Sequence, residues 1–213
     1  MAADVLGYRF NRLINKFRYG LFLEYLQSRL TKLGCEITPF YVIREAVDRT
    51  RLKVDEPSLE GYTCEFLDSI EMEKISAIRG DGPSLEELRS RRAKGNRCFG
   101  MRYHDEIIAF NWIDSQEISS GLFRQPLKNN EAYLFDMYTD KRFRGKNIAP
   151  YLRYRTYQVL TAEGKNCFYS ISNFFNKASL KFKKKLDSKP VKFGIFFRFF
   201  RKPSRSWILK KYR

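Results

Sequence analysis

The sequence predicts an α/β fold, with a mixed α+β sheet and a helical extension at the N-terminus. Residues 5–33 place apolar side chains three and four positions apart, which is the period of an amphipathic helix. From residue 63 onward, stretches with strand character alternate with helical stretches, and glycine or proline separates them. The 213 residues, 43% of them hydrophobic, suffice for one full core. We therefore expect an extension at 1–60 and one α/β domain at 61–213.

The extension is expected to be basic and amphipathic. Gly20 is a point at which its helical stretch can divide into two helices. Residues 35–45 have the character of an extended piece interrupted by Pro39, and Pro57 and Gly61 are typical of a linker. The apolar positions of the helical stretch are Leu6, Phe10, Leu13, Phe17, Leu21 and Tyr25.

The first half of the α/β domain is expected to be rich in hairpins. Ser84, followed three residues later by Glu87, predicts the start of a helix, and Gly95 predicts its end. The turn at Asp105 and Glu106 separates two alternating stretches and predicts a hairpin. The elements expected here are a strand at 63–70, a helix at 84–95, a hairpin at 97–116 and a loop at 121–130.

The second half is expected to alternate strands and helices. Gly164 follows a long apolar-periodic stretch and predicts the end of a helix. The elements expected here are a strand at 131–140, a helix at 148–164, a strand at 166–172, a basic helix at 176–187 and strands at 191–200 and 205–212.

Composition argues against several classes of protein. No apolar run reaches the roughly 18 residues needed to span a bilayer, and the N-terminus lacks the apolar stretch of a signal peptide. His104 is the sole histidine, and Cys35, Cys64, Cys98 and Cys167 are scattered singly. We therefore expect no metal site, and reduced thiols in a cytoplasmic protein.

The net charge of +17 is concentrated at the two ends of the chain. Residues 174–213 hold 14 Lys and Arg and one acidic residue, and residues 1–33 hold six and two, whereas the middle is neutral. Basic ends of this kind suit an anionic partner, such as phosphate groups, an acidic membrane surface or, with less support, nucleic acid. A solvated basic surface without a partner is the alternative.

A basic, glycine-containing turn precedes the helix expected at 148–164. The free N–H groups and positive dipole of a helix N-terminus attract anions, and glycine lets the backbone approach a ligand closely. Arg142, Arg144 and Lys146 add positive charge around Gly145. This turn predicts a phosphate or diphosphate site, although a basic turn without a ligand would have the same sequence.

The order of elements and two motifs resemble the GNAT family, the Gcn5-related N-acetyltransferases. The turn Arg142-Phe143-Arg144-Gly145-Lys146-Asn147 resembles the family's Q/R-x-x-G-x-G/A signature, with Asn147 in place of the last small residue. Asn176 and Ser179 match the family's N-x-x-S at the start of the next helix. The resemblance covers residues 63–213 and implies that acetyl-CoA lies between two splayed parallel strands.

Carried over to this chain, the resemblance implies a set of residues that bind acetyl-CoA. Backbone groups of the first splayed strand would hold the pantetheine arm, the turn and helix start would hold the pyrophosphate, and the second motif would contact the thioester end. In that order the residues are Met137, Tyr138 and Thr139, then Arg142, Arg144, Gly145, Lys146, Asn147, Ile148 and Ala149, then Asn176 and Ser179.

The resemblance implies direct attack of an amine on a thioester, which requires a base and a proton donor. Glu131 and Asp136 are the candidate bases, although an exposed acid at a strand start and a buried ion-paired acid are the structural alternatives. Lys183 stands where many members of the family carry the tyrosine that protonates the thiolate.

The sequence thus predicts an acyl-CoA-dependent N-acyltransferase that moves an acetyl group to a primary amine. The acceptor could be a small molecule, such as an amino sugar on a nucleotide or lipid carrier, or else a protein lysine or N-terminus. A non-catalytic basic module that binds nucleic acid or a membrane surface is the other alternative. We expect a cytoplasmic protein that can lie at the membrane surface.

Overall fold

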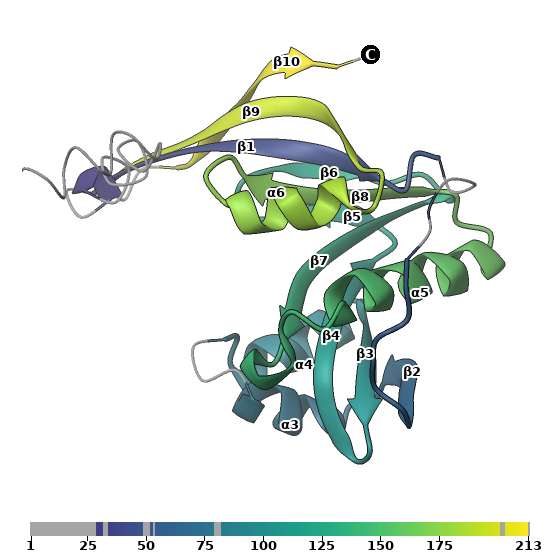
Figure 1. Ribbon diagram of the computed structural model, residues 1–213. Coiled ribbons are helices and arrows are strands. Elements are labelled where there is room, and N and C mark those ends of the chain that lie inside the picture. Colours follow the sequence, from purple (N-terminus) through teal and green to yellow (C-terminus); the bar gives the residue numbers. More distant parts are fainter. Residues whose placement is uncertain are drawn as a thin grey trace, which may run out of the picture.

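The computed structural model describes residues 29–31, 34–48, 52, 54–78, 82–200 and 203–212. Most of the expected N-terminal helix lies outside these residues. The described part is built on an eight-stranded mixed sheet with the strand order β10-β9-β1-β8-β7-β4-β3-β2 (Figure 1). Its strands are β1 (Cys35–Glu45), β2 (Tyr62–Leu67), β3 (Arg97–Tyr103), β4 (Glu106–Asp114), β7 (Glu131–Thr139), β8 (Cys167–Asn173), β9 (Lys189–Phe199) and β10 (Arg205–Lys211).

The mixed sheet and the alternating second half confirm the predicted fold class. The α-helices that pack on this sheet are α3 (Glu71–Ile78), α4 (Leu85–Ala93), α5 (Ile148–Ala162) and α6 (Lys177–Lys184). Ser84 caps α4 as expected, because its hydroxyl accepts a hydrogen bond from Glu87 N at 3.2 Å. Gly95 and Gly164 follow α4 and α5 with φ values of +84°, which glycine adopts without strain.

Helix α3 was not predicted, although a local signal for it exists. Asp68 N donates to the Glu71 carboxylate at 2.8 Å, and Asp68 Oδ1 accepts from Glu71 N at 3.2 Å. This reciprocal pair is a capping box built from two acidic residues. The helix is also short, so its apolar period covers only two turns.

The expected boundary near residue 60 needs correction, because β1 belongs to the same sheet as the rest of the chain. β1 pairs with β8 on one side and with β9 on the other, both antiparallel. Pro39 does not interrupt the strand, since it lies opposite Ile195 of β9, just before the pairing with β8 starts at Phe40. The extension that precedes the sheet can therefore include at most the residues before Cys35.

The expected loop at 121–130 contains part of a small second sheet. β5 (Glu117–Ser119) pairs with β6 (Arg124–Pro126), and the Arg124 guanidinium binds the Glu117 carboxylate through two hydrogen bonds. This two-stranded ribbon covers one face of the main sheet, where Ile118 is buried with Phe40 and Tyr133.

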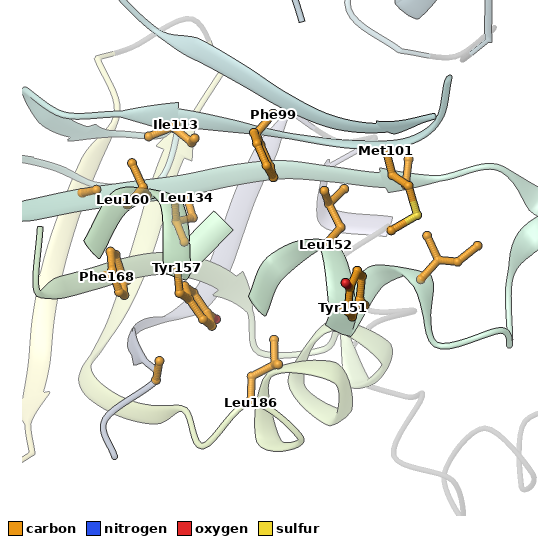
Figure 2. Close-up of a cluster of buried hydrophobic side chains, with 14 of the residues drawn as sticks. Phe99, Met101, Ile113, Leu134, Tyr151, Leu152, Tyr157, Leu160, Phe168 and Leu186 are labelled. Atoms are coloured by element: carbon orange, nitrogen blue, oxygen red, sulfur yellow. The ribbon is translucent and has the colours of Figure 1, made fainter. Parts of the chain in front are cut away.

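Helices cover both faces of the main sheet. Helix α5 packs on β3, β4, β7 and β8, and Phe182 of α6 packs against the same cluster. Helices α3 and α4 pack on the opposite face against Trp112 and Phe110 of β4. The buried residues labelled in Figure 2 are Phe99, Met101, Ile113, Leu134, Tyr151, Leu152, Tyr157, Leu160, Phe168 and Leu186.

Candidate active site

The parallel strands β7 and β8 pair at one end and separate at the other. The pairing comprises Glu131 with Cys167, Ala132 with Phe168 and Tyr133 with Tyr169. Beyond Tyr133 the two strands diverge, so Leu134–Thr139 of β7 leaves one edge without a strand partner. In Figure 1, β7 runs away from β8 toward the part of the sheet that holds β4, β3 and β2.

A cleft of about 960 Å³ lies where the strands separate. Its walls are the free part of β7, the turn after β7, and the facing sides of α5 and α6. The residues that line it are Ile78, Leu134, Phe135, Asp136, Met137, Tyr138, Thr139, Asp140, Lys141, Arg144, Ala149, Arg153, Ile171, Asn176, Ala178, Ser179, Phe182 and Lys183. Four cations and two acids are among them, and both acids already bind arginine. The cleft therefore favours an anionic ligand.

A bulge in β7 lies in the wall of this cleft. Phe110 of β4 stands opposite Tyr138 and Trp112 opposite Phe135, so Asn111 faces both Asp136 and Met137. Asp136 has a φ of +46°, a conformation that Asp and Asn tolerate better than most residues. The bulge interrupts the ladder and turns backbone groups away from β4.

The turn between β7 and α5 has the shape that its sequence predicts. Gly145 and Asn147 have φ values of +83° and +59°, so Asn147 accepts the left-handed conformation expected of it. A Cβ added at Gly145 would meet no atom within 4 Å, which leaves open space beside the turn. The first hydrogen bond of α5 runs from Tyr151 N to Asn147 O at 3.2 Å. The amides that precede Tyr151 in α5 thus have no intrahelical partner.

The structure brings part of the expected acetyl-CoA set into the cleft. The residues that line it are Met137, Tyr138, Thr139, Arg144, Ala149, Asn176 and Ser179. Arg142 instead binds Asp140 and Glu106, Lys146 lies over the Phe143 ring, and Ile148 is buried in the core. Gly145 and Asn147 shape the turn without lining the cleft, and Asn147 Nδ2 donates to Asp55 O at 2.7 Å.

A second cleft, of about 850 Å³, reaches β7 from the opposite face of the sheet. Its walls come from α4, the end of β4, the β5–β6 ribbon and β7. The two clefts share Phe135 and Asp136. Its lining residues are Glu87, Ser90, Arg91, Lys94, Asn96, Asp114, Gln116, Glu117, Ser119, Ser120, Gly121, Arg124, Tyr133, Phe135 and Asp136. A ligand in each cleft would meet the other ligand near the bulge.

Asp136 is held in place by Arg91 of α4. The guanidinium donates to Asp136 Oδ2 at 2.6 Å and also binds Glu87, and both Arg91 and Asp136 are largely buried. The Arg91 guanidinium lies over the neighbouring rings of Trp112 and Phe135, 5.3 Å from each centroid. This packing fixes the carboxylate at the junction of the two clefts.

Glu131 lies at the closed end of β7 and lines neither of these two clefts. Its carboxylate accepts hydrogen bonds from Lys128 N at 2.9 Å and from Tyr169 Oη at 3.3 Å. It is 9% exposed, so it is not the exposed strand-start acid of the structural alternative. The two candidate bases are therefore not brought together.

A buried charge cluster lies beside the first cleft. Glu45 of β1 lies 3.5 Å from Arg153 Nε and 3.9 Å from Lys183 Nζ, and Tyr157 Oη donates to it at 2.5 Å. Burial by itself raises the pKa of Glu45, but Arg153 and Lys183 outweigh burial and lower that pKa below its ordinary value. Two cations surround one carboxylate, so the cluster carries an excess of positive charge next to the cleft.

Lys183 connects this cluster to the cleft. Its ammonium donates to Ser172 Oγ at 2.7 Å and to Ile171 O at 3.1 Å. Ser172 Oγ in turn lies 2.9 Å from Ser179 Oγ, and Ser179 and Lys183 both line the cleft. Burial lowers the pKa of Lys183 to about 8, an effect that Glu45 opposes and Arg153 reinforces.

Sequence reasoning missed Arg91, Arg153 and Glu45. A lone arginine in a helix and an acid at the end of a strand have no signature, because their partners come from distant parts of the chain. Arg153 alone gave a weak signal, since it follows the anion-binding turn on the helix that this turn begins.

Among the described residues, no group of three His, Cys, Asp or Glu side chains is arranged to bind a metal ion. The described helices include none that is both long and apolar enough to cross a membrane.

Searches of family models and of curated proteins found no match. Solved structures give many matches at low sequence identity. A GNAT-family acetyltransferase from Colwellia psychrerythraea has a TM-score of 0.56 and 14% identity, over 76% of this chain and 56% of that one. One assigned to the same family, from Novosphingobium aromaticivorans, has a TM-score of 0.55 and 14% identity, over 80% and 69%. A conserved protein from Staphylococcus epidermidis has a TM-score of 0.55 and 10% identity, over 83% and 67%. The chain therefore has the fold of the GNAT acetyltransferases.

Proposed function

We propose that this chain, on its GNAT fold, is an N-acyltransferase that uses acetyl-CoA to acetylate a primary amine. The observation that carries the proposal is the divergence of β7 from β8 after only three paired positions, beside a cationic turn at the start of α5. Because the two strands diverge, the backbone groups on one edge of β7 have no strand partner in the described part of the chain and can bind a ligand. A linear donor with a phosphate end fits between that edge and the turn.

The chain's own groups fit such a donor. Lys141 and Arg144 line the cleft next to the free amides of α5, and Gly145 leaves open space there for phosphate oxygens. Met137, Tyr138 and Thr139 offer the free edge of β7 to the pantetheine amides. Thr139 Oγ1 is buried without a hydrogen-bond partner among the described residues, so it remains available to a ligand.

The acceptor amine enters from the second cleft in this proposal. That cleft is polar, and it contains a stacked pair of rings, Tyr133 and Phe135, with centroids 5.2 Å apart. Hydroxyl-rich ligands bind to surfaces of this mixed kind, which favours an amino sugar on a nucleotide or lipid carrier over a flat apolar amine. Glu117 and Arg124 bind each other at the cleft wall and would contact the hydroxyl groups of the sugar.

Acetyl-CoA supplies a thioester, a carbonyl with a good leaving group. Asp136, at the junction of the clefts, would orient the attacking amine and take its proton, directly or through one water molecule. The backbone of the bulge at Asp136 and Met137 would donate to the developing oxyanion. Lys183 would donate a proton to the departing CoA thiolate, either directly or through Ser172 and Ser179.

The four cysteines are free, which agrees with a reducing compartment. We infer that the protein acts in the cytoplasm.

The test is Gly145→Glu, which should abolish acetyl-CoA binding measured by calorimetry. A carboxylate would enter the open space beside the turn, where the pyrophosphate is expected. Gly164→Glu is the matched control, because Gly164 has nearly the same φ and equally open surroundings. It lies at the opposite end of the same helix. Unchanged affinity in a folded Gly145→Glu protein, or equal loss in both variants, would contradict the proposed cleft.

A further inference from the structure

One face of the β1–β9–β10 part of the sheet is apolar and uncovered among the described residues. We call it the outer strip. Tyr41 lies opposite Phe193, Ile37 opposite Phe197, and Ile195 opposite Trp207, so these side chains share a face. On the opposite face of the same strands, Phe40, Val42 and Phe196 are buried under the β5–β6 ribbon. The outer strip comprises Ile37, Pro39, Tyr41, Phe174, Phe193, Ile195, Phe197, Phe199, Trp207 and Leu209.

The outer strip is mostly aromatic, and its side chains are half-buried or exposed. Phe197 contacts both Phe199 and Trp207, and Tyr41, Phe174 and Phe193 contact one another. Trp207 is 51% exposed and Leu209 is 59% exposed. A contiguous apolar patch of this kind is unusual on a free surface and points to an interaction site.

Basic side chains flank the outer strip on two sides. Arg205 and Lys210 of β10 lie opposite Phe197 and Phe193 and are exposed, and neither has a carboxylate partner within the described part of the chain. On the other side, α6 carries further lysines, and Phe174 lies two residues before its cap Asn176. The exposed lysines of α6 and its C-terminal end are Lys177, Lys181, Lys184 and Lys185.

From this arrangement we propose that the outer strip is a docking surface for an anionic lipid bilayer. Trp, Phe and Leu enter the boundary between headgroups and acyl chains, while the surrounding Lys and Arg bind anionic headgroups. The same charges would suit nucleic acid, but Ile37, Pro39, Ile195 and Leu209 offer no aromatic face to a base. The aliphatic share of the strip therefore favours lipid. The inference does not depend on the proposed catalytic activity.

Trp207 provides a direct measurement. The chain has two tryptophans, and Trp112 is fully buried, so any change in exposure on docking comes from Trp207. Vesicles of phosphatidylcholine mixed with phosphatidylglycerol should shift the emission to the blue and protect Trp207 from acrylamide. Vesicles of phosphatidylcholine alone should have little effect, and added salt should reverse the effect. Trp207→Phe should remove the signal.

Charge-reversal variants test the flanking cations. Replacing Arg205 and Lys210 by Glu should weaken partitioning by at least roughly 25-fold, since each basic residue near an anionic leaflet strengthens binding about fivefold. Glutamine at the same two positions should give a smaller loss, and it tests whether the edge strand still folds. The matched control replaces Lys74 and Lys128, which lie away from the outer strip, by Glu. It changes the net charge equally and should bind nearly as the parent chain does.

Three results would overturn the proposal. In the first, the control weakens binding as much as the β10 variant, and the effect is then one of net charge alone. In the second, Trp207 of the free protein is already shielded from acrylamide, so another part of the chain or a second copy covers the strip. In the third, single-stranded oligonucleotides protect Trp207 while the vesicles do not, so the partner is nucleic acid.

Discussion

Asp136 and Glu131 are five residues apart on one strand, yet their surroundings differ. Asp136 lies where the two clefts meet, whereas Glu131 lies at the closed end of the strand pair. We expect Asp136→Asn to lower kcat by about 10²–10⁴-fold, the usual effect of losing a general base. Asparagine also tolerates the positive φ at this position. Glu131→Gln is the matched control and should retain near-parent kcat; a larger loss in Glu131→Gln than in Asp136→Asn would reverse the assignment.

Lys183 predicts a pH dependence. Its pKa of about 8 means that it holds its proton below pH 8 and loses it above. If it returns the proton to the thiolate, kcat should be steady below about pH 8 and decline above it. Lys183→Met should lower kcat and remove that decline, whereas Lys184→Met, an exposed neighbour on α6, should keep the parent profile. A decline that persists unchanged in Lys183→Met would assign it to another group.

At the scale of elements, the outer strip depends on how closely β9 fits between β1 and β10. A Cβ at Gly194 would meet Phe40 Cζ at 2.7 Å and Trp207 O at 2.8 Å. The oxygen belongs to the backbone of β10 and cannot rotate away, so one of the strands must move.

We therefore expect Gly194→Ala to lower the free energy of unfolding by about 1–3 kcal/mol, the range typical of overpacking. Urea denaturation measures this change, and Trp207 emission reports whether β10 leaves the sheet. Gly121→Ala is the control, because a Cβ there meets nothing within 4 Å. Equal stability of the two variants would show that β10 adapts without cost.

At the scale of the whole molecule, the sheet divides into two parts that β7 joins. The part with β2, β3 and β4 carries α3 and α4 and forms walls of the second cleft. The part with β1, β8 and β9 carries α6 and the buried cluster of Glu45, Arg153 and Lys183. β7 belongs to both parts, and the basic C-terminal region continues outward into the outer strip. The charge at that end of the chain is therefore divided between α6, beside the first cleft, and the strands β9 and β10 at the edge of the sheet.

The sequence by itself determined the local features of this protein. Ser84, Gly95 and Gly164 fixed the limits of helices through their own backbone preferences. The turn from Arg142 to Asn147 and the N-x-x-S pair predict a ligand site at the starts of α5 and α6, because each motif acts within a few residues of itself, and that site stays a prediction. The same short range explains why most strands and helices after residue 62 could be predicted in their order along the chain, whereas α3 and the β5–β6 ribbon were not predicted.

Only the tertiary structure decided which distant residues meet. β1 pairs with β8 and β9, which lie more than a hundred residues later in the chain. Because of that separation, no local signal could show the pairing. Arg91 reaches Asp136 across 45 positions, and Glu45 meets Lys183 across a still longer separation. Burial and charge then gave Lys183 its lowered pKa and Asp136 its fixed place, and both properties depend on the surrounding atoms rather than on the residue itself.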